Sequence, residues 1–120
     1  MRKTIFLNYK GKSLKLNVAV CGGFEKLRGL MFKSKETGML LFEFPENTKI
    51  RIHSFFVFFP FFGVWLDDEN KVIQIKRVKP FTFSVRSKKS FAKILEIPIN
   101  KRNSNVIKFL CSQPHSVIDK

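Results

Sequence analysis

Residues Phe55 to Phe62 read FFVFFPFF, and this stretch decides how the rest of the chain must fold. Six of its eight residues are Phe, and burying one Phe side chain contributes about 1.5–3 kcal/mol. Left exposed, so apolar and uncharged a segment has the composition of an aggregating one. We therefore expect the octet to form the core, with a partner-binding surface as the alternative. If the octet is core, Phe58→Ala should cost about 3–5 kcal/mol.

The length of 120 residues predicts one domain, with a loose tail from about residue 112 to residue 120. The formal net charge of +14 favours nucleic acid, an anionic membrane or an acidic protein as partner, although a lysine-rich surface also serves solubility and stability. No apolar run approaches the length of a transmembrane helix, and the N-terminus does not read as a signal peptide. We expect a cytoplasmic protein, and the sequence leaves its oligomeric state open.

The order of apolar residues along the chain predicts mostly β-structure. Alternation at 4–9 and 13–20 around Gly11 predicts a hairpin, and a second hairpin is expected at 61–67 and 71–78. Helical spacing predicts short helices over about 23–32 and from Ser87 or Ser90 to Leu95. Further strands are expected at 39–44, 49–57, 81–85 and 106–111, with a turn at 45–48, a bend or edge at Pro60 and a polar loop at 101–105.

Strands that follow one another through turns, without regular alternation with helices, indicate a compact antiparallel sandwich or barrel-like single domain with one or two short helices. Cys21 and Cys111 form no metal-binding spacing, so we expect buried free thiols and neither a metal nor a cofactor. The alternative for Cys21, which precedes Gly22 and Gly23 at a helix start, is a reactive thiol acting with His53.

Three blocks of sequence follow one another along the chain: RGLMF from Arg28, GMLLFEFP from Gly38, and HxFF...FPxxxVWLD from His53 to Asp67. Together with KVIQIKRVKPF from residue 71 and KILEIP from residue 93, this set resembles the family called Domain of Unknown Function 192. The resemblance covers about residues 14–109.

The resemblance implies a compact, mostly β, sandwich-like domain whose short helix carries the RGLM residues, and it implies no function. One position departs from the family pattern. Phe62 stands where the family has a carboxylate two residues after the proline, so a family site that uses that acid is not carried over. The later acid, Asp67, is retained.

The first candidate site combines Arg28, His53 and Asp67, which are polar residues beside apolar neighbours within the resembling blocks. In a shared pocket, Arg28 would bind an anion, His53 would carry a proton or act as a ligand, and Asp67 would orient His53. Each residue also has a structural interpretation: a helix end, an ordinary strand position and the start of a turn.

The second candidate is a basic face with interleaved aromatic residues. Charges that follow phosphates, with rings that stack on bases, are typical of single-stranded nucleic-acid platforms. Phe81, Phe83 and Phe91 supply such rings if they face outward; if they face inward, a general polyanion patch remains. The basic residues are Lys76, Arg77, Lys79, Arg86, Lys88, Lys89, Lys93, Lys101 and Arg102.

These observations favour a non-enzymatic binding domain whose basic face contacts an anionic partner such as RNA or DNA. A small-molecule or catalytic pocket near Arg28, His53 and Asp67 is the first alternative. A protein-interaction module that exposes part of the Phe octet is the second.

Overall fold

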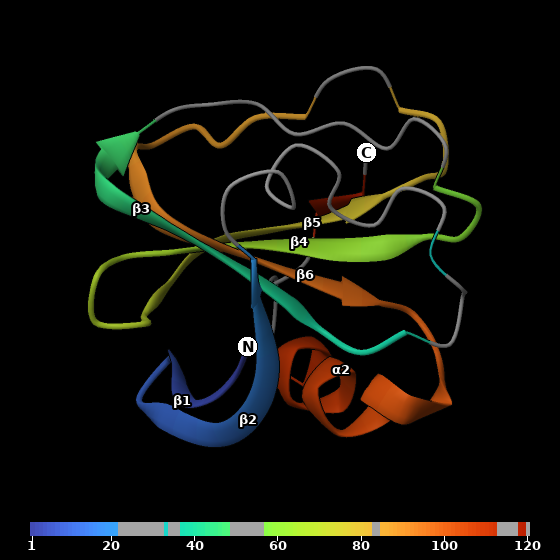
Figure 1. Ribbon diagram of the computed structural model, residues 1–120, viewed down its shortest axis with the longest axis horizontal. Coiled ribbons are helices and arrows are strands. Elements are labelled where there is room, and N and C mark those ends of the chain that lie inside the picture. The colour runs from blue at the N-terminus through green and yellow to red at the C-terminus, as the bar shows by residue number, and fades with distance from the viewer. Residues whose placement is uncertain (22–32, 34–36, 49–56, 83–84, 113–117, 120) are drawn as a thin grey trace.

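The computed structural model describes residues 1–21, 33, 37–48, 57–82, 85–112 and 118–119. Its strands form one curled sheet with the order β1-β2-β3-β6-β4-β5-β7 (Figure 1). The prediction of a mainly β domain with one or two short helices is confirmed. The elements are β1 (Arg2–Tyr9), β2 (Lys12–Cys21), β3 (Leu40–Thr48), β4 (Phe61–Leu66), β5 (Val72–Val78), β6 (Phe91–Pro98), the 3-10 helix η1 (Lys101–Asn103), α2 (Ser104–Cys111) and β7 (Ile118–Asp119).

Both predicted hairpins are present. β1 and β2 pair antiparallel, and the turn between them places Lys10 at φ 51° and Gly11 at φ 80°. Two successive positive φ angles are the geometry of a tight hairpin turn that matches the twist of its strands, and Gly11 adopts it without strain. β4 and β5 pair antiparallel from Phe61 opposite Val78 to Leu66 opposite Val72.

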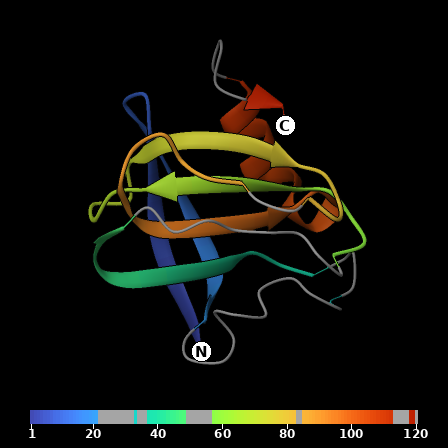
Figure 2. The ribbon, with the colours of Figure 1, turned by 90° about the horizontal axis from the view of Figure 1, so that it is seen from above.

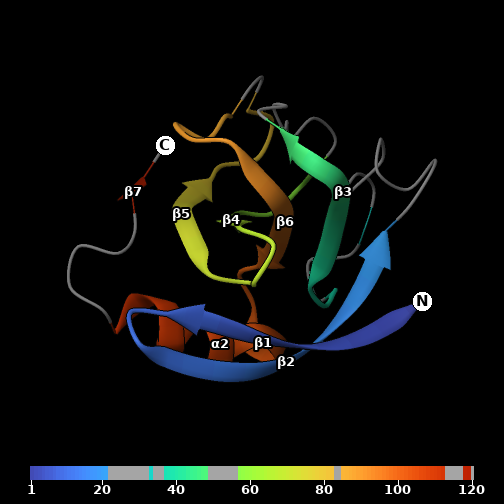
Figure 3. The ribbon, with the colours of Figure 1, turned by 90° about the vertical axis from the view of Figure 1, so that its left-hand side faces the viewer.

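The sheet curls until its two ends approach each other, as the end-on view in Figure 3 shows. The backbone N–H of Asn8 in β1 donates to the carbonyl of Asn70, just before β5, at 2.9 Å. Asn8 also bridges to Lys71, and its side-chain amide donates to the Glu69 carbonyl at 3.1 Å. These contacts join the first strand to the β4–β5 turn, so the sheet forms a half-barrel.

The central strands carry the core on both of their faces. All six residues of β4 are buried: Phe62, Val64 and Leu66 pack on the side of α2 and the β1–β2 hairpin, and Phe61 and Trp65 pack on the other side. Figure 2 shows the hairpin crossing behind β3, β6, β4 and β5, which is where the first of these clusters lies. A strand covered on both sides loses the alternation typical of a half-exposed strand.

The Phe octet is core in most of its described part. Val57, Phe59, Phe61 and Phe62 are buried, whereas Phe58 is 62% exposed. The expectation of a buried octet is therefore confirmed for four residues and wrong for Phe58; residues 55–56 lie outside the described part of the chain. Pro60 lies in the irregular segment before β4, where its missing amide hydrogen costs no ladder bond, and its carbonyl accepts from the Ile99 N–H at 3.1 Å.

Three element predictions near the C-terminus are wrong. The segment from Ser90 to Leu95 is not helical, because β6 occupies it and is buried on both faces, so its apolar spacing imitates a helix. The helices η1 and α2 occupy residues 101–111, where a loop at 101–105 and a strand at 106–111 were expected. Val106 and Leu110, four positions apart, form the buried stripe of α2, while Ile107 and Phe109 are β-formers that pack partly against the core.

Three further expectations fail on described residues. β3 continues through the predicted turn at 45–48, with a register shift against β6 between Glu43 and Thr48. Phe81 lies in a turn at φ 59° and not in a strand. Cys111 is exposed, although Cys21 is buried, and neither forms a disulfide within the described residues. The predicted helix at 23–32 and most of the predicted strand at 49–57 lie outside the described residues.

Candidate functional site

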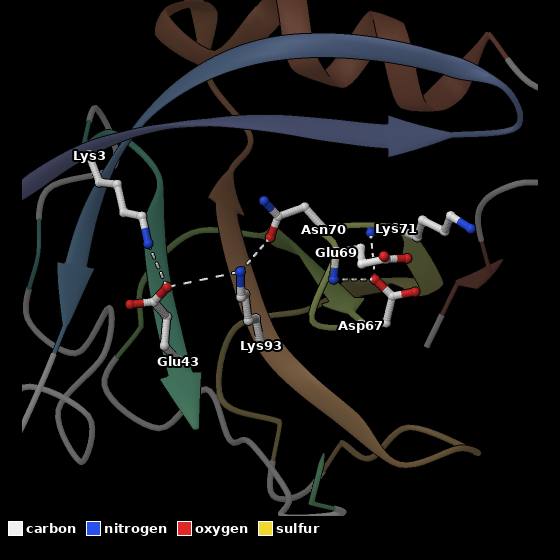
Figure 4. Close-up of polar contacts among 7 residues, drawn as sticks. All are labelled: Lys3, Glu43, Asp67, Glu69, Asn70, Lys71 and Lys93. Atoms are coloured by element: carbon white, nitrogen blue, oxygen red, sulfur yellow. Dashed lines mark hydrogen bonds and ion pairs between the residues drawn. The ribbon is translucent and has the colours of Figure 1, made fainter. Parts of the chain in front are cut away.

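Asp67 closes the turn between β4 and β5. Its Oδ1 accepts backbone hydrogen bonds from Glu69 and from Lys71, both at 2.9 Å (Figure 4). The Asp67 N–H also donates to the Lys71 carbonyl at 3.0 Å. These bonds give Asp67 the turn-forming role that the sequence left as an alternative. Its proposed pocket partners, Arg28 and His53, lie outside the described residues.

Lys93 belongs to a polar network that runs from its largely buried side chain to the exposed Lys3–Glu43 pair. Its ammonium group donates to Asn70 Oδ1 at 2.7 Å and lies 4.0 Å from Glu43 Oε2, which also pairs with Lys3 at 2.8 Å (Figure 4). The Lys93 side chain is 16% exposed. This network ties β1, β3 and β6 to the β4–β5 turn.

Lys76 and Arg77 point to opposite faces of β5. Lys76 is 6% exposed, and its ammonium group donates to the Arg86 carbonyl at 2.6 Å and lies 6.0 Å from the Trp65 ring centre. Arg77 is half-buried and pairs in register with Asp119 of β7. Neither residue shares an open surface with the remaining basic residues of the predicted face.

Four exposed residues of the predicted basic face lie between β5 and β6, in residues 79–82 and 85–90, here called the basic loop. Lys79, Arg86, Lys88 and Lys89 are exposed on it, and its sequence contains no acid. Gln74 of β5 fixes its second half, because Gln74 Oε1 accepts from the Lys88 N–H at 2.8 Å and from the Ser87 hydroxyl at 3.1 Å. The strand therefore anchors the loop at Ser87 and Lys88.

Two exposed aromatic rings lie at the start of the basic loop. Phe81 is 51% exposed, and its ring meets that of Phe58 edge to face with centroids 5.3 Å apart. Phe81 holds a positive φ, which costs a bulky residue free energy. Phe91 is fully buried and leaves the predicted set of surface rings, and Phe83 lies outside the described residues. The sequence offered no signal that Phe58 would join Phe81.

Lys101 and Arg102 lie apart from the basic loop, on η1 at the C-terminal end of β6. Both are exposed. The Asn100 side chain caps η1 by accepting the Asn103 N–H at 2.9 Å, and Asn103 donates to the Pro98 carbonyl at 2.8 Å. The nine predicted basic residues thus lie in five places. Lys76 is buried, Lys93 belongs to the network with Glu43 and Asn70, and Arg77 lies on the other face of β5. The basic loop carries Lys79, Arg86, Lys88 and Lys89, and η1 carries Lys101 and Arg102.

Glu96 is a buried acid that the sequence reasoning did not single out. It is 5% exposed, and burial raises its pKa to about 8. The register places Gly63 of β4 opposite both Glu96 of β6 and Lys76 of β5, so the two charged residues flank a glycine on one face. On the same face, the Trp65 indole nitrogen is buried with no hydrogen-bond partner within the described chain. A buried acid is costly to retain and marks a position to test for function.

Within the described residues, no group of three or more His, Cys, Asp or Glu side chains is placed to hold a metal ion. Nor is any helix in that part of the structure both long and apolar enough to cross a membrane.

The curled, mostly β domain and the sequence blocks on it agree with one family. The family model of DUF192, described as an uncharacterized ACR, matches residues 5–108. The chain therefore belongs to the DUF192 family, as the sequence blocks predicted. A UPF0127 protein of Thermococcus sibiricus is 34% identical over 79 residues, which make up 63% of this chain and 50% of that relative.

Two solved structures have the same fold. A candidate transcription regulator from Sinorhizobium meliloti 1021 gives a TM-score of 0.70 at 17% identity, covering 81% of this chain and 79% of that one. A protein of unknown function from Novosphingobium aromaticivorans also gives 0.70, at 14% identity, covering 81% of this chain and 73% of that one. At such identities the likeness concerns the fold.

Proposed function

We propose that this protein is a non-enzymatic binding domain that contacts single-stranded nucleic acid through the basic loop and the Phe58–Phe81 pair. The observation that carries the proposal is the presence of exposed cations and an exposed ring on one loop, with a second ring packed against it. Cations neutralise phosphates without reading sequence, and exposed rings stack on any base.

The anchoring of the loop supports the proposal. Gln74 accepts from the Ser87 hydroxyl and the Lys88 N–H, and Lys76 donates to the Arg86 carbonyl. A cation held by its backbone loses less conformational entropy on binding than one on a mobile segment, so more of its attraction appears as affinity. The acids of the β4–β5 turn, Asp67 to Glu69, lie at the opposite end of β5 from Lys79.

The test is fluorescence anisotropy of a labelled single-stranded RNA at roughly 50 and 200 mM salt. Four contacted phosphates, one for each exposed cation of the loop, would give a slope of about −3 in log affinity against log salt and a roughly fiftyfold loss of affinity across this range. Lys88→Glu with Lys89→Glu should abolish binding and leave the melting temperature nearly unchanged.

The matched control is Lys12→Glu with Lys108→Glu, which makes the same charge change at exposed positions of β2 and α2. If both double variants lose affinity equally, net charge and not the basic loop drives binding, and the proposal fails. Phe58→Leu and Phe81→Leu separate stacking from apolar contact, because they keep bulk and lose the ring. An apolar protein interface would instead appear as concentration-dependent oligomers that salt does not dissociate.

A further inference from the structure

A second basic site lies away from the basic loop, in an open cavity between β2 and the η1–α2 turn. Its volume is about 280 Å³, and Gly38 and Met39, which precede β3, complete its wall. β3 pairs with the C-terminal part of β2, Ala19 to Cys21, so the first part of β2 has no β3 partner along this side. The cavity occupies that open edge.

Three cationic side chains line the cavity: Arg2 from β1, Lys15 from β2 and Arg102 from η1. Asn17 and Asn105 also line the cavity, and the described lining contains no acid. The two ion pairs found in the described part of the chain, both on Glu43, involve none of these three cations. The charge of the cavity is therefore uncompensated by the neighbouring described residues.

Hydrogen bonds hold Arg2 in place, and Arg102 packs against Gly38. Arg2 donates from Nε to Asn17 Oδ1 at 3.2 Å and from Nη2 to the Asn17 carbonyl at 3.3 Å. The guanidinium of Arg102 lies against Gly38: a Cβ at that position would come within 3.2 Å of Arg102 Cζ and Nη2. The absence of a side chain at Gly38 leaves room for Arg102 at this close distance. Guanidinium groups bind oxyanions through paired N–H donors, and placing them beforehand lowers the cost of binding.

We infer that this cavity binds a small phosphate-bearing anion. Ordinary small-molecule sites have volumes of roughly 300–1,000 Å³, and the volume of this cavity is at the lower limit of that range. The cavity therefore suits a small ligand, such as inorganic phosphate or the phosphate group of a small monoester. Two guanidinium groups and one ammonium group match the charge and the several acceptor oxygens of phosphate. The inference is independent of the proposed nucleic-acid contact, because it uses none of the residues of the basic loop.

The experiment is a titration of the ¹⁵N-labelled protein with inorganic phosphate at constant ionic strength, followed by NMR. We expect saturable shifts of the Asn17 and Asn105 side-chain amides, with a dissociation constant in the millimolar range or below. Arg102→Gln should weaken binding at least tenfold. Lys108→Gln, the same charge change at an exposed position of α2 outside the lining, should leave binding unchanged.

Gly38→Ala gives a test without any change of charge. The added methyl group crowds the Arg102 guanidinium, which must shift by a few tenths of an ångström, so phosphate binding should weaken modestly while the net charge stays the same. A linear, unsaturating response to phosphate, or equal losses in Arg102→Gln and Lys108→Gln, would overturn the inference.

Tighter binding of glycerol phosphate than of inorganic phosphate would identify a phosphate monoester as the ligand class, and equal binding would identify free phosphate. Lys88→Glu with Lys89→Glu should lose RNA binding and keep phosphate binding, so the two proposals can fail separately.

Discussion

The ammonium group of Lys76 donates a hydrogen bond of 2.6 Å to the backbone carbonyl of Arg86, and this bond joins a buried cation to the basic loop. The ammonium group of Lys76 also lies over the ring of Trp65 in the neighbouring strand β4. The residue was expected to bind a polyanion directly. Because Lys76 is buried and donates to the Arg86 carbonyl, we predict that it positions the backbone at Arg86.

Lys76→Met should therefore lower both stability and RNA affinity. A buried hydrogen bond to a charged group contributes about 1.5–3 kcal/mol, and methionine keeps most of the apolar volume of the lysine. Urea denaturation measures the first effect and anisotropy the second. Arg77→Met is the control, because it removes the same charge from the opposite face of β5 and should change RNA affinity much less. Equal RNA affinities of Lys76→Met and the wild-type protein would show that the anchor does not position the loop for binding.

Phe58 and Phe61 belong to the same octet and should respond very differently to truncation. Phe61 is fully buried between strands, so Phe61→Ala should cost about 3–5 kcal/mol. Phe58 is 62% exposed, and within the described residues its ring contacts the ring of Phe81. Phe58→Ala should therefore cost less than about 1 kcal/mol. Chemical denaturation of the two variants checks the pair. A cost for Phe58→Ala as large as that for Phe61→Ala would place the ring in the core.

Asp67→Ala should destabilise the β4–β5 turn by about 1–2 kcal/mol. The substitution leaves the Glu69 and Lys71 amides without their acceptor, and this turn also receives the contact from Asn8 that closes the half-barrel. Asp67→Asn keeps the Oδ1 acceptor and should retain most of the stability. Thermal melting compares the two variants. If Asp67→Asn is as damaging as Asp67→Ala, the charge of Asp67 matters beyond its turn.

The parts of the fold that the sequence predicted are those where local chemistry determines the structure. Period-two alternation around Gly11 identifies the first hairpin because one face of each strand is exposed and the turn needs positive φ. β6 was misread because both of its faces are buried, so no exposed residue marks the strand period. Helix α2 was misread because its eight residues include β-formers and its stripe has few fully buried positions.

The candidate sites depended on tertiary relationships that no local pattern contains. The basic residues could be found by composition, but the sequence could not separate buried Lys76 from exposed Lys88, since that depends on how the basic loop folds back on β5. The pairing of Phe58 with Phe81 joins two loops. The cavity at Arg102 requires β2, Gly38 and η1 to meet.

Glu96 makes a prediction about pH. Burial raises the pKa of this carboxyl to about 8, from 4.5 in the absence of burial. Between these values the folded protein keeps the proton while the unfolded chain releases it, so the contribution of Glu96 to stability is fully present below pH 4.5 and is lost as the pH rises toward 8. The slope is at most about 1.4 kcal/mol per pH unit.

Glu96→Gln replaces the carboxyl with a neutral amide of the same shape and removes this slope. The difference in unfolding free energy between the variant and the wild-type protein should therefore grow in favour of the variant from pH 5 to pH 8. The total change should be several kcal/mol, since each pH unit between the two pKa values contributes up to about 1.4 kcal/mol. Urea denaturation at a series of pH values measures it. Taking the difference cancels the titration of all other groups, including the many lysines. A difference that stays constant with pH would mean that Glu96 ionises normally in the folded protein, and that its side chain reaches water or a cation.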